Sequence, residues 1–578
     1  MGFVVRIVLL DGYVDEPTCL GVPPYISTYP RYIAGAIWSV DSRIEILYQT
    51  IDEVRLSFQR AQETWAHSDL LILIAGMVVP GKYLGGTPIS PREARELFSD
   101  SRLERIPKVL VGPWGRFGCG LEGGRPALSP ESLSPPFDHI LRGDPEVVIY
   151  NALREGCDFS RVDLAESRSS ARQIEPFLTR GAQIVRQHPN YERNYLICEI
   201  ETYRGCPRYV VGGCSFCIEP NYGPPQTREA ADIASEIQAL YSEGIRAFRL
   251  GRQSDIFSYG SREMGEDEFP TPSVSSIRSL FSRIRTAAPD IQVLHIDNVN
   301  PGTIAHHPEE SKQVAKTIMK YHTVGDVAAF GIESLDPEVI RRNNLKVNPD
   351  EAYEAVATLN EVGAQSPPRE LPHLLPGINL VYGLPGESDA TLEHNLSFLE
   401  RLRDEGLLVR RINIRQVIGL PGTALSDPTP STISHSAFLR HKKQIREEID
   451  TVMLQRVAPA GTIIRSAFLE AERGKNSLLR PLASYPLLCH MPGRPSRDVT
   501  DVVVTDHGPR SVTVLPHPFP INSASMSQLG AIPGIGSKRA ARLKLGTPWR
   551  NITHIHSQLD IDIPSWLQNS IEFEDKQR

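Results

Sequence analysis

The N-terminal part of the chain alternates short apolar runs with amphipathic segments, a pattern typical of a parallel β-sheet covered by helices. The apolar runs, which we expect to be strands, are residues 3–10, 43–48, 69–76 and 107–113. Glycine and proline follow the last two runs, where an open α/β sheet places its ligand crevice, although ordinary turns use the same residues. The pattern predicts an α/β layer over residues 1–185.

A second alternating series follows a polar connector and predicts six further strands with helices between them. The expected strands are residues 196–202, 247–253, 291–298, 326–334, 377–387 and 410–423. Apolar positions recur at helical spacing in segments 228–244 and 348–363, and each segment ends on a glycine that can cap a helix. Six such units predict a full or partial β/α barrel over residues 190–430, a fold whose chemistry lies on loops after the strands.

The pattern changes again after residue 430. Helical periodicity comes first, and residues 501–515 then alternate around His507 and Gly508, which predicts a β-hairpin. The last 50 or so residues are again helical in pattern. We therefore expect a helical and β-hairpin accessory region over residues 431–522 and a small helical module over residues 523–578, in a chain of α/β class.

Composition and charge describe an ordinary soluble chain of several domains. The chain has 578 residues, a formal net charge of -7 and 40% hydrophobic residues, which gives no overall electrostatic signature for nucleic acid or membrane. Its longest apolar stretch, Leu70 to Pro80, is too short to span a bilayer, and the N-terminus lacks a signal-peptide pattern. Eight scattered cysteines do not suit a disulfide scaffold. We expect a cytoplasmic protein with no membrane association.

Three cysteines form the clearest chemical motif. Cys206, Cys214 and Cys217 follow the first strand of the second series, in a loop rich in glycine. Three thiolates from one loop suit a soft metal centre. Structural zinc normally takes four protein ligands, whereas an iron-sulfur cluster with three cysteine ligands leaves one iron open. Two interpretations stay open here: such a cluster, or zinc completed by Cys198, His295 or another residue.

Four strand-end segments together resemble the radical S-adenosylmethionine (SAM) superfamily. They are the cysteine loop, FGIES (330–334), LVYGLPGES (380–388) and IRQVIGLPGT (414–423). The resemblance covers about residues 195–425. Seven residues separate the first two cysteines, where the commonest spacing in the superfamily is three. The resemblance implies that Cys206, Cys214 and Cys217 hold a 4Fe-4S cluster, whose open iron binds SAM for reductive cleavage to a 5′-deoxyadenosyl radical.

The same resemblance implies further contacts to the cofactors. Phe216, between the last two cysteines, would cover the cluster or the adenine. The other implied contacts are Gly251 and Gln253 at the methionine group, Glu333 and Ser334 at the ribose, Gly383, Gly386 and Glu387 beside the adenosine, and Ile414 and Gln416 at the adenine edge. Asp255 could replace the acidic residue of the motif at the second strand, while Gln253 could equally be an ordinary surface residue.

The N-terminal layer resembles the cobalamin-binding domain that precedes many radical SAM cores. It lacks the Asp-x-His-x-x-Gly signature, so bound cobalamin would have no histidine ligand there. The methylthiotransferase branch of the superfamily also carries an N-terminal α/β domain, with three cysteines for a second cluster. Cys19, Cys119 and Cys157 could serve in that way or could be buried thiols.

The segment Leu529 to Leu543 resembles a helix-hairpin-helix motif. The motif implies free backbone N–H groups at Gly534, Ile535 and Gly536, at a helix N-terminus that can bind phosphate. Basic residues without an acidic one follow from there: Lys538, Arg539, Arg542, Lys544 and Arg550. A packing or dimerisation hairpin is the alternative. The whole arrangement resembles archaeal radical SAM iron-sulfur proteins that carry this motif at the C-terminus.

These expectations combine into a functional hypothesis. A radical SAM enzyme would methylate or methylthiolate RNA such as tRNA, bind RNA or DNA through its C-terminal module, and take electrons from a reductant such as ferredoxin or flavodoxin. A cobalamin-dependent methylase of a small molecule or protein is one alternative. A nucleic-acid-binding protein with a structural or sensing metal site, and no enzymatic activity, is the other.

Overall fold

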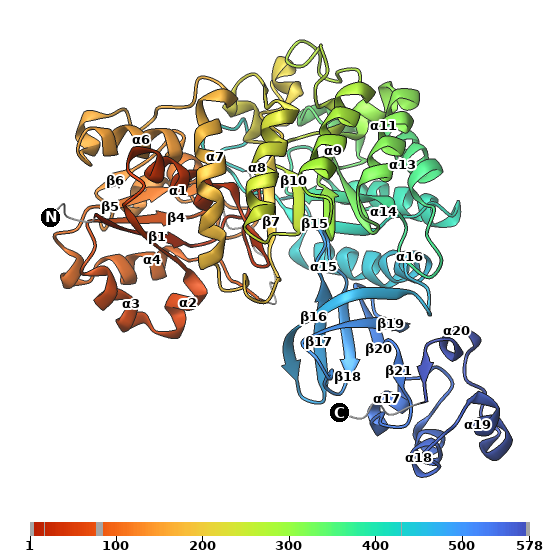
Figure 1. Cartoon of the computed structure of the whole chain (residues 1–578). Helices are drawn as coiled ribbons and strands as arrows, with labels where there is room; N and C mark the ends of the chain where they lie inside the picture. Colours follow the sequence, from red (N-terminus) through yellow and green to blue (C-terminus); the bar gives the residue numbers. More distant parts are fainter. Residues whose placement is uncertain (1–4, 17, 77–84, 429–430, 574–578) are drawn as a thin grey trace.

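Five parallel strands form the N-terminal sheet, in the order β3-β1-β4-β5-β6. The computed structural model of the chain describes residues 5–16, 18–76, 85–428 and 431–573 (Figure 1). The strands are β1 (Arg6–Asp11), β3 (Glu45–Thr50), β4 (Leu70–Ile74), β5 (Lys108–Val111) and β6 (His139–Ile140). The four predicted strands are confirmed by the first four of these. The chain reverses direction across the sheet between β1 and β4, the position where such sheets bind ligands.

Helices cover both faces of this sheet, which explains why its strands are apolar along their whole length. One face packs on α1 (Thr28–Val40) and α6 (Pro145–Arg154), and the other on α2 (Ile51–Leu56), α3 (Phe58–Trp65) and α4 (Pro91–Phe98). The layer also contains α5 (Pro113–Phe117) and α7 (Glu175–Gly181). Buried side chains alternate accordingly: Ile7 and Leu9 face α1, while Val8 and Leu10 face the opposite side.

The core is a partial barrel, whose six main strands match the six predicted ones. They are β7 (Ile197–Glu201), β10 (Ala247–Gly251), β11 (Val293–Ile296), β13 (Asp326–Glu333), β14 (Leu374–Tyr382) and β15 (Arg411–Gln416). Two parallel sheets make up the barrel, β11-β10-β7-β2 and β12-β13-β14-β15, and the chain passes from one to the other between β11 and β12 (Asn298–Val299). The edge strands β2 and β15 do not pair in the described part of the chain, so the barrel is open on that side.

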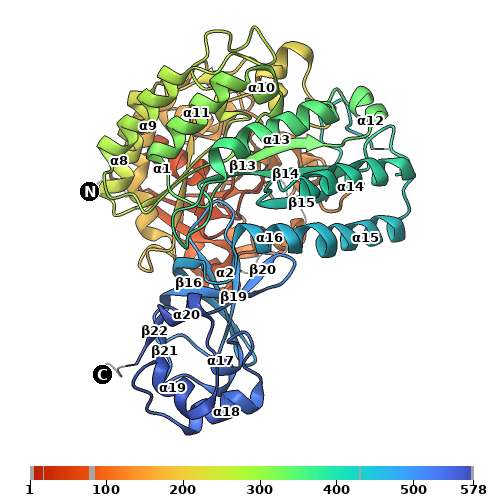
Figure 2. The same ribbon diagram turned by 90° about the vertical axis from the view of Figure 1, so that its right-hand side faces the viewer.

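Helices line the outside of the partial barrel (Figure 2). They are α8 (Ala230–Ser242), α9 (Val274–Ala287), α10 (Pro301–His306), α11 (Pro308–Tyr321), α12 (Pro337–Arg342), α13 (Pro349–Gly363) and α14 (Asp389–Asp404). A short hairpin of β8 (Tyr203–Arg204) and β9 (Gln226–Thr227) flanks the cysteine loop. The helices bury their apolar faces on the strands, so the carboxyl ends of the strands carry the loops and their polar side chains.

The N-terminal layer and the barrel are joined in one hydrophobic core. The strand β2 (Tyr25–Ile26) belongs to the N-terminal layer by sequence, yet it pairs in parallel with β7 of the barrel. One continuous cluster of buried side chains runs from Ile7 and Ile33 in the layer to Ile200 in the barrel. The N-terminal layer is therefore packed against the barrel through a shared sheet and a shared hydrophobic core.

Five more strands form a small closed barrel that projects from the core (Figures 1 and 2). They are β16 (Ile463–Arg473), β17 (Asn476–Pro481), β18 (Leu488–Pro492), β19 (Val499–His507) and β20 (Ser511–Pro516). The predicted hairpin is confirmed as β19 and β20. The prediction of a single hairpin was incomplete, because β16 carries four charged residues and register shifts in it interrupt the polar-apolar alternation.

A continuous helical segment connects the core to this small barrel. It comprises α15 (His435–Gln444), a π-helical turn (Ile445–Asp450) and α16 (Thr451–Val457). The C-terminal module beyond the barrel contains α17 (Met526–Gly530), α18 (Ser537–Leu545), α19 (Ile552–Leu559) and α20 (Ser565–Gln568), with β21 (Phe519–Pro520) paired to β22 (Ile571–Glu572). None of the helices in the described ranges is long and apolar enough to cross a bilayer.

Candidate functional site

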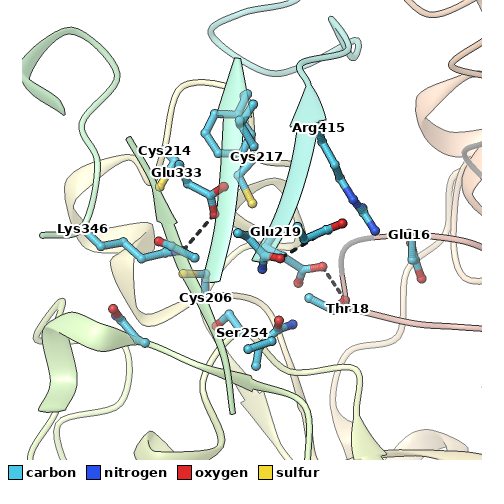
Figure 3. A pocket seen from close by; sticks show the side chains of 18 of the residues that line it. Glu16, Thr18, Cys206, Cys214, Cys217, Glu219, Ser254, Glu333, Lys346 and Arg415 are labelled. Atoms are coloured by element: carbon cyan, nitrogen blue, oxygen red, sulfur yellow. Dashed lines mark hydrogen bonds and ion pairs between the residues drawn. The ribbon is translucent and has the colours of Figure 1, made fainter. Parts of the chain in front are cut away.

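A cavity of about 270 Å³ lies at the carboxyl ends of the core strands (Figure 3). Cys206, Cys214, Cys217 and Phe216 all line it, so the structure brings the whole predicted cysteine motif into one space. Cys206 and Cys214 are buried, and Cys217 is half-buried. We call this space the cysteine cavity. It is where the loops after the barrel strands converge, as the position of the motif predicted.

The residues that could complete a zinc site lie apart from the cysteine loop. In the described part of the chain, no three His, Cys, Asp or Glu side chains converge closely enough to hold one metal ion. A zinc ion needs its sulfur ligands at about 2.3 Å, whereas a cluster places each thiolate on a different iron and keeps them apart. Cys198 is buried away from the cavity, and His295 accepts a hydrogen bond from the backbone N–H of Ser484 (3.0 Å). Neither Cys198 nor His295, the two residues named as possible extra zinc ligands, therefore lines the cysteine cavity.

The cysteine loop is held in shape by local contacts. Gly213 has a φ of +69°, and a Cβ atom there would lie 2.3 Å from the ring of Pro220, so the loop can close only with glycine at this position. Arg208 donates to the Sγ of Cys214 (3.2 Å) and to the carbonyl of Asn344 (2.8 Å). The Asn344 side chain in turn donates to the carbonyl of Gly213 (2.8 Å). The loop after α12 therefore fixes the second cysteine.

Lys346 is a cation of the site that the sequence pattern did not reveal. Its Nζ lies 3.8 Å from the Glu333 carboxylate and donates to the carbonyl of Gly331 (3.1 Å), as Figure 3 shows. Burial lowers the pKa of Lys346, but the thiols of the cysteine loop and Glu333 raise it by more. Burial also raises the pKa of Cys206, to about 11. A lysine held charged beside the three cysteines and Glu333 provides one cation at the edge of the cysteine cavity.

We expect Lys346→Met to weaken SAM binding at least about 10-fold while leaving the iron content unchanged, because a charge-assisted contact is worth about 1.5 kcal/mol or more. Isothermal titration of SAM into the reconstituted protein measures the first quantity, and iron analysis the second. Lys316→Met, on the exposed face of α11, is the matched control. Equal SAM affinity in the two variants would exclude Lys346 from the site.

Glu333, predicted at the ribose, reaches the cysteine cavity through an irregular backbone. It has a φ of +71°, an uncommon conformation for a residue other than glycine, and the β13–β14 register shifts between Gly331 and Glu333. The shift directs the carboxylate into the cavity. Ser334, predicted beside it, is fully buried and accepts a hydrogen bond from the backbone of Asp336 (3.2 Å). The unusual backbone conformation of Glu333 therefore coincides with a side chain that lines the cysteine cavity.

The residues predicted at the second strand lie just outside the cavity lining. Gly251 packs so tightly that a Cβ atom would lie 1.6 Å from the Glu199 carboxylate. Gln253 is fully buried and donates to the carbonyl of Leu250 (2.9 Å), which also rules out the surface alternative for it. Asp255 accepts from two hydroxyls and two backbone N–H groups and so acts in the local structure. The cavity is lined instead by Ser254.

The turn after β14 and the end of β15 supply the other predicted contacts. The Glu387 carboxylate accepts from the backbone N–H of Gly383 at 2.7 and 2.8 Å, so it closes its own turn. Gly386 closes the same turn with a φ of +96°. Gln416 lines the cysteine cavity, whereas Ile414 lies outside its lining. Of these five predicted contacts, only Gln416 lines the cavity.

The N-terminal layer supplies one wall of the cysteine cavity, which the sequence did not reveal. Asp15, Glu16 and Thr18, in the loop after β1, line it. Thr18 donates to the carboxylate of Glu219 (2.8 Å), which follows the cysteine motif directly (Figure 3). This wall forms through contacts between residues about 200 positions apart in the sequence, such as Thr18 and Glu219, so no local sequence pattern reveals it. The carboxyl end of the N-terminal sheet therefore faces the cysteine loop.

The remaining cysteines of the N-terminal layer lie apart from one another. Cys19 belongs to the core on one side of the sheet and Cys119 to the cluster on the other side, while Cys157 packs at the rim of the first core. This arrangement fits buried thiols. The crevice between β1 and β4 is crossed by the backbone bonds Gly12 N to Ile74 O (2.8 Å) and Gly76 N to Tyr13 O (3.3 Å). Residues 77–84 lie outside the described residues, and cobalamin at this sheet edge stays a prediction.

The turn between α17 and α18 is the predicted phosphate site, and one part of that prediction was wrong. Gly534 and Gly536 are exposed, and a Cβ atom at either would meet nothing within 4 Å. Ile535, however, is buried, and its N–H donates to the carbonyl of Ile532 (2.9 Å), because the turn closes with a local hydrogen bond. Lys538 and Arg539 are exposed at the start of α18. A helix-hairpin-helix identity for this module stays a prediction.

One part of the sequence matches a family model, and most of its length matches two archaeal proteins. Residues 200–399 match the model of the radical SAM superfamily. An uncharacterized protein of Methanocaldococcus jannaschii is 43% identical over 517 residues, which cover 88% of this chain and 92% of the relative. An uncharacterized protein of Archaeoglobus fulgidus is 41% identical over 548 residues, covering 94% of this chain and 96% of the relative.

More distant similarity is confined to part of the chain. The tRNA-2-methylthio-N(6)-dimethylallyladenosine synthase of Clostridium novyi is 24% identical over 247 residues, covering 42% of this chain and 47% of the relative. Among solved structures, the radical SAM methyltransferase TsrM from Kitasatospora setae, with tryptophan and a SAM analogue bound, gives a TM-score of 0.49. It is 16% identical and covers 73% of this chain and 75% of its own.

Proposed function

Because the chain belongs to the radical SAM superfamily, whose members are enzymes that hold a 4Fe-4S cluster and SAM, we propose that it uses them to methylate or methylthiolate RNA. The observation that carries the chemical part is the cysteine cavity, where three cysteines, Phe216, Lys346 and Glu333 line one space. The RNA part is supported by the exposed basic start of α18 and by the distant similarity to a tRNA-modifying synthase.

Cys206, Cys214 and Cys217 would hold the cluster, which, once reduced by a donor such as ferredoxin or flavodoxin, would supply the electron for cleaving SAM to methionine and a 5′-deoxyadenosyl radical. The chain's own residues position and protect this chemistry. Arg208 and Asn344 fix the second cysteine, while Phe216 packs beside Cys214 and Cys217 and shields them from water. Lys346 and Glu333 provide one cation and one carboxylate beside the cysteines, suited to the carboxylate and hydroxyl groups of SAM.

A second candidate is a cobalamin-dependent methylase of a small molecule or protein. The N-terminal sheet favours it, since its carboxyl edge, with the ligand-binding switch point between β1 and β4, faces the cysteine cavity. This candidate requires one bound cobalamin per chain and no affinity for RNA. Absorption spectra of protein reconstituted with hydroxocobalamin separate it from the first proposal.

The test of the proposed function uses protein purified and reconstituted without oxygen. We expect about four irons and four sulfides per chain, with formation of 5′-deoxyadenosine from SAM in the presence of dithionite. Transcribed tRNA added to this reaction should yield a nucleoside heavier by a methyl or methylthio group in mass spectrometry. A protein that carries the cluster but never cleaves SAM would contradict the proposal, and cleavage without any RNA product would restrict it to the radical step.

The C-terminal module gives a separate prediction. Replacing Lys538 and Arg539 together by glutamate should weaken RNA binding about 10-fold or more and lower the slope of log Kd against log salt by about 1.4, since about two phosphate contacts are lost. Fluorescence anisotropy of labelled tRNA at several salt concentrations measures both. The control replaces Lys316 and Lys320 on α11 by glutamate. Equal affinities in the two variants would remove the module from RNA binding.

A further inference from the structure

A second, larger cavity opens beside the cysteine cavity, on the open side of the partial barrel. Its volume is about 1010 Å³. Three parts of the chain enclose it: the edge strands β2 and β15, the helical segment from Leu439 to Leu454, and the turns of the small barrel near Tyr485 and Arg510. The cavity is at the upper end of the size range of ligand sites, roughly 300–1,000 Å³.

The side chains that line this cavity are mostly cationic. Eight arginines and lysines face three acidic residues. Lys443 is paired with Glu447 and Arg480 with Glu470. The other six cations form no ion pair with any described residue: Arg410, Arg411, Arg415, Lys442, Arg446 and Arg510. We call this space the arginine cavity. Cations gathered in a partly buried space without carboxylate partners repel one another, which is costly unless an anion joins them.

The electrostatic strain is visible in the individual groups. Burial lowers the pKa of Arg410 to about 10, and the neighbouring Arg411 and Arg510 lower it further. Burial likewise lowers the pKa of Arg411 to about 10. Asp450 could compensate, but burial raises its pKa to about 7 despite three nearby arginines. The lining of the cavity therefore carries more cations than carboxylates, eight against three.

The helix that lines the cavity is irregular at the same place. The π-helical turn Ile445–Asp450 interrupts the helical segment and contributes Arg446 and Asp450 to the lining. Thr451 donates its hydroxyl to the carbonyl of Arg446 (3.0 Å), which stabilises the wider turn. Short π-helical turns are rare and often occur at functional sites, where they redirect side chains.

The arginine cavity adjoins the cysteine cavity. Six residues line both, including Arg411, Arg415 and Tyr485. Tyr485 comes from the β17–β18 loop of the small barrel, and its hydroxyl donates to Asp297 at the end of β11 (2.6 Å). Arg410 donates to the carbonyl of Tyr485 (2.9 Å). A molecule bound among the arginines would thus lie next to the space where the cysteines and Phe216 meet.

We propose that the arginine cavity is the substrate site and that it binds the phosphate groups of a phosphate-bearing substrate. Arginine is the side chain best suited to phosphate, because its planar guanidinium donates two parallel hydrogen bonds. The inference rests on the proposed function and specifies its substrate. The phosphates can belong to an RNA strand or to a small phosphorylated molecule, and both place the uncharged part of the substrate toward the cysteine cavity.

The test compares two probes on the reconstituted holoenzyme. Anisotropy of a labelled ten-nucleotide oligouridylate reports strand binding, and isothermal titration of inorganic pyrophosphate reports phosphate binding alone. The double variant Arg446→Ala with Arg510→Ala should weaken at least one probe about 10- to 100-fold, since each charged hydrogen bond is worth about 1.5 kcal/mol. Arg440→Ala is the matched control, because Arg440 is exposed on the same helix and does not line the cavity.

Each outcome decides the proposal. Loss of oligouridylate and pyrophosphate binding supports an RNA strand, and loss of pyrophosphate binding alone supports a small phosphorylated substrate. Undiminished binding of both probes overturns the proposal, as does a parallel loss of SAM affinity, because the cavity would then belong to the cofactor site. Single variants and Arg→Lys replacements, checked by thermal melting, keep the test available if the double variant is unstable. Failure of the wild type to cleave SAM would contradict the proposed function instead.

Discussion

Cys214→Ala will remove the iron-sulfur cluster and abolish SAM cleavage, with residual 5′-deoxyadenosine formation at least about 1,000-fold below wild type. A cluster with three cysteine ligands cannot replace the lost thiolate from nearby, because Cys198 and Cys19 lie in the hydrophobic core and not in the cysteine cavity. The loss also leaves Arg208 without its sulfur acceptor, which loosens the loop. Iron content and dithionite-dependent product measure the two effects.

The control for this experiment is Cys157→Ala. Cys157 is half-buried and lies in the N-terminal layer, outside the cysteine cavity, so its variant should keep the iron content and activity of the wild type. Circular dichroism should give the same helix content for both variants, since neither position lies inside a helix. Equal iron in Cys214→Ala and wild type would show that Cys214 is not a ligand.

Glu236→Gln will lower the free energy of unfolding by about 3–5 kcal/mol, the largest stability effect we expect from a single polar replacement. Glu236 on α8 accepts from Arg31 of the N-terminal layer and from Arg228 (2.7 Å), and all three side chains are fully buried. Without the carboxylate, two buried guanidinium groups lose their counterion. Denaturant unfolding followed by circular dichroism gives the value.

The same triad makes the protein sensitive to acid. Burial raises the pKa of Glu236, but Arg228 and Arg31 lower it by more, so the net shift is downward. The triad therefore stabilises the fold above the pKa of a free glutamate and loses this contribution as the pH falls through the lowered value.

Two further variants test the explanation for Glu236. Glu309→Gln removes an exposed carboxylate paired with Lys312 (3.2 Å) and should cost under about 1 kcal/mol. Replacing Arg31, Arg228 and Glu236 together by methionine should recover most of the stability, since no charge is then left unpaired. A loss for Glu236→Gln no larger than for Glu309→Gln would contradict the buried-charge argument.

The parallel strands could be predicted because each is apolar along its length. The run 69–76 became β4, and the run 326–334 became β13, since strands buried on both faces show no alternation and few charges. The small barrel could not be predicted in the same way. Strands β16 and β17 are only partly buried and carry charged residues, and a register shift interrupts their pairing.

The part of the candidate site that lies in a single loop could be predicted from the sequence. Cys206, Cys214, Cys217 and Phe216 are close in sequence, and Glu333 and Gln416 end strands of the same barrel. Lys346 and Tyr485 were not predictable, because a lone lysine in a loop and a tyrosine in a distant barrel carry no local pattern. The position of a residue in a motif also does not show where its side chain points. Gln253 and Glu387 both form hydrogen bonds with the nearby backbone and do not line the cavity.

The pairing of β2 with β7 has a consequence for the order in which the chain can fold during synthesis. Tyr25 and Ile26 leave the ribosome early, but their partners Ile197 and Cys198 are made about 170 residues later, and Glu236 follows later still. At 5–20 residues per second, the N-terminal segment waits roughly 10–40 s with an unpaired strand and an uncompensated arginine. We expect a growing chain to need a chaperone during this interval. Residues 1–185 made alone would keep β2 unpaired and would leave Arg31 without its carboxylate partner.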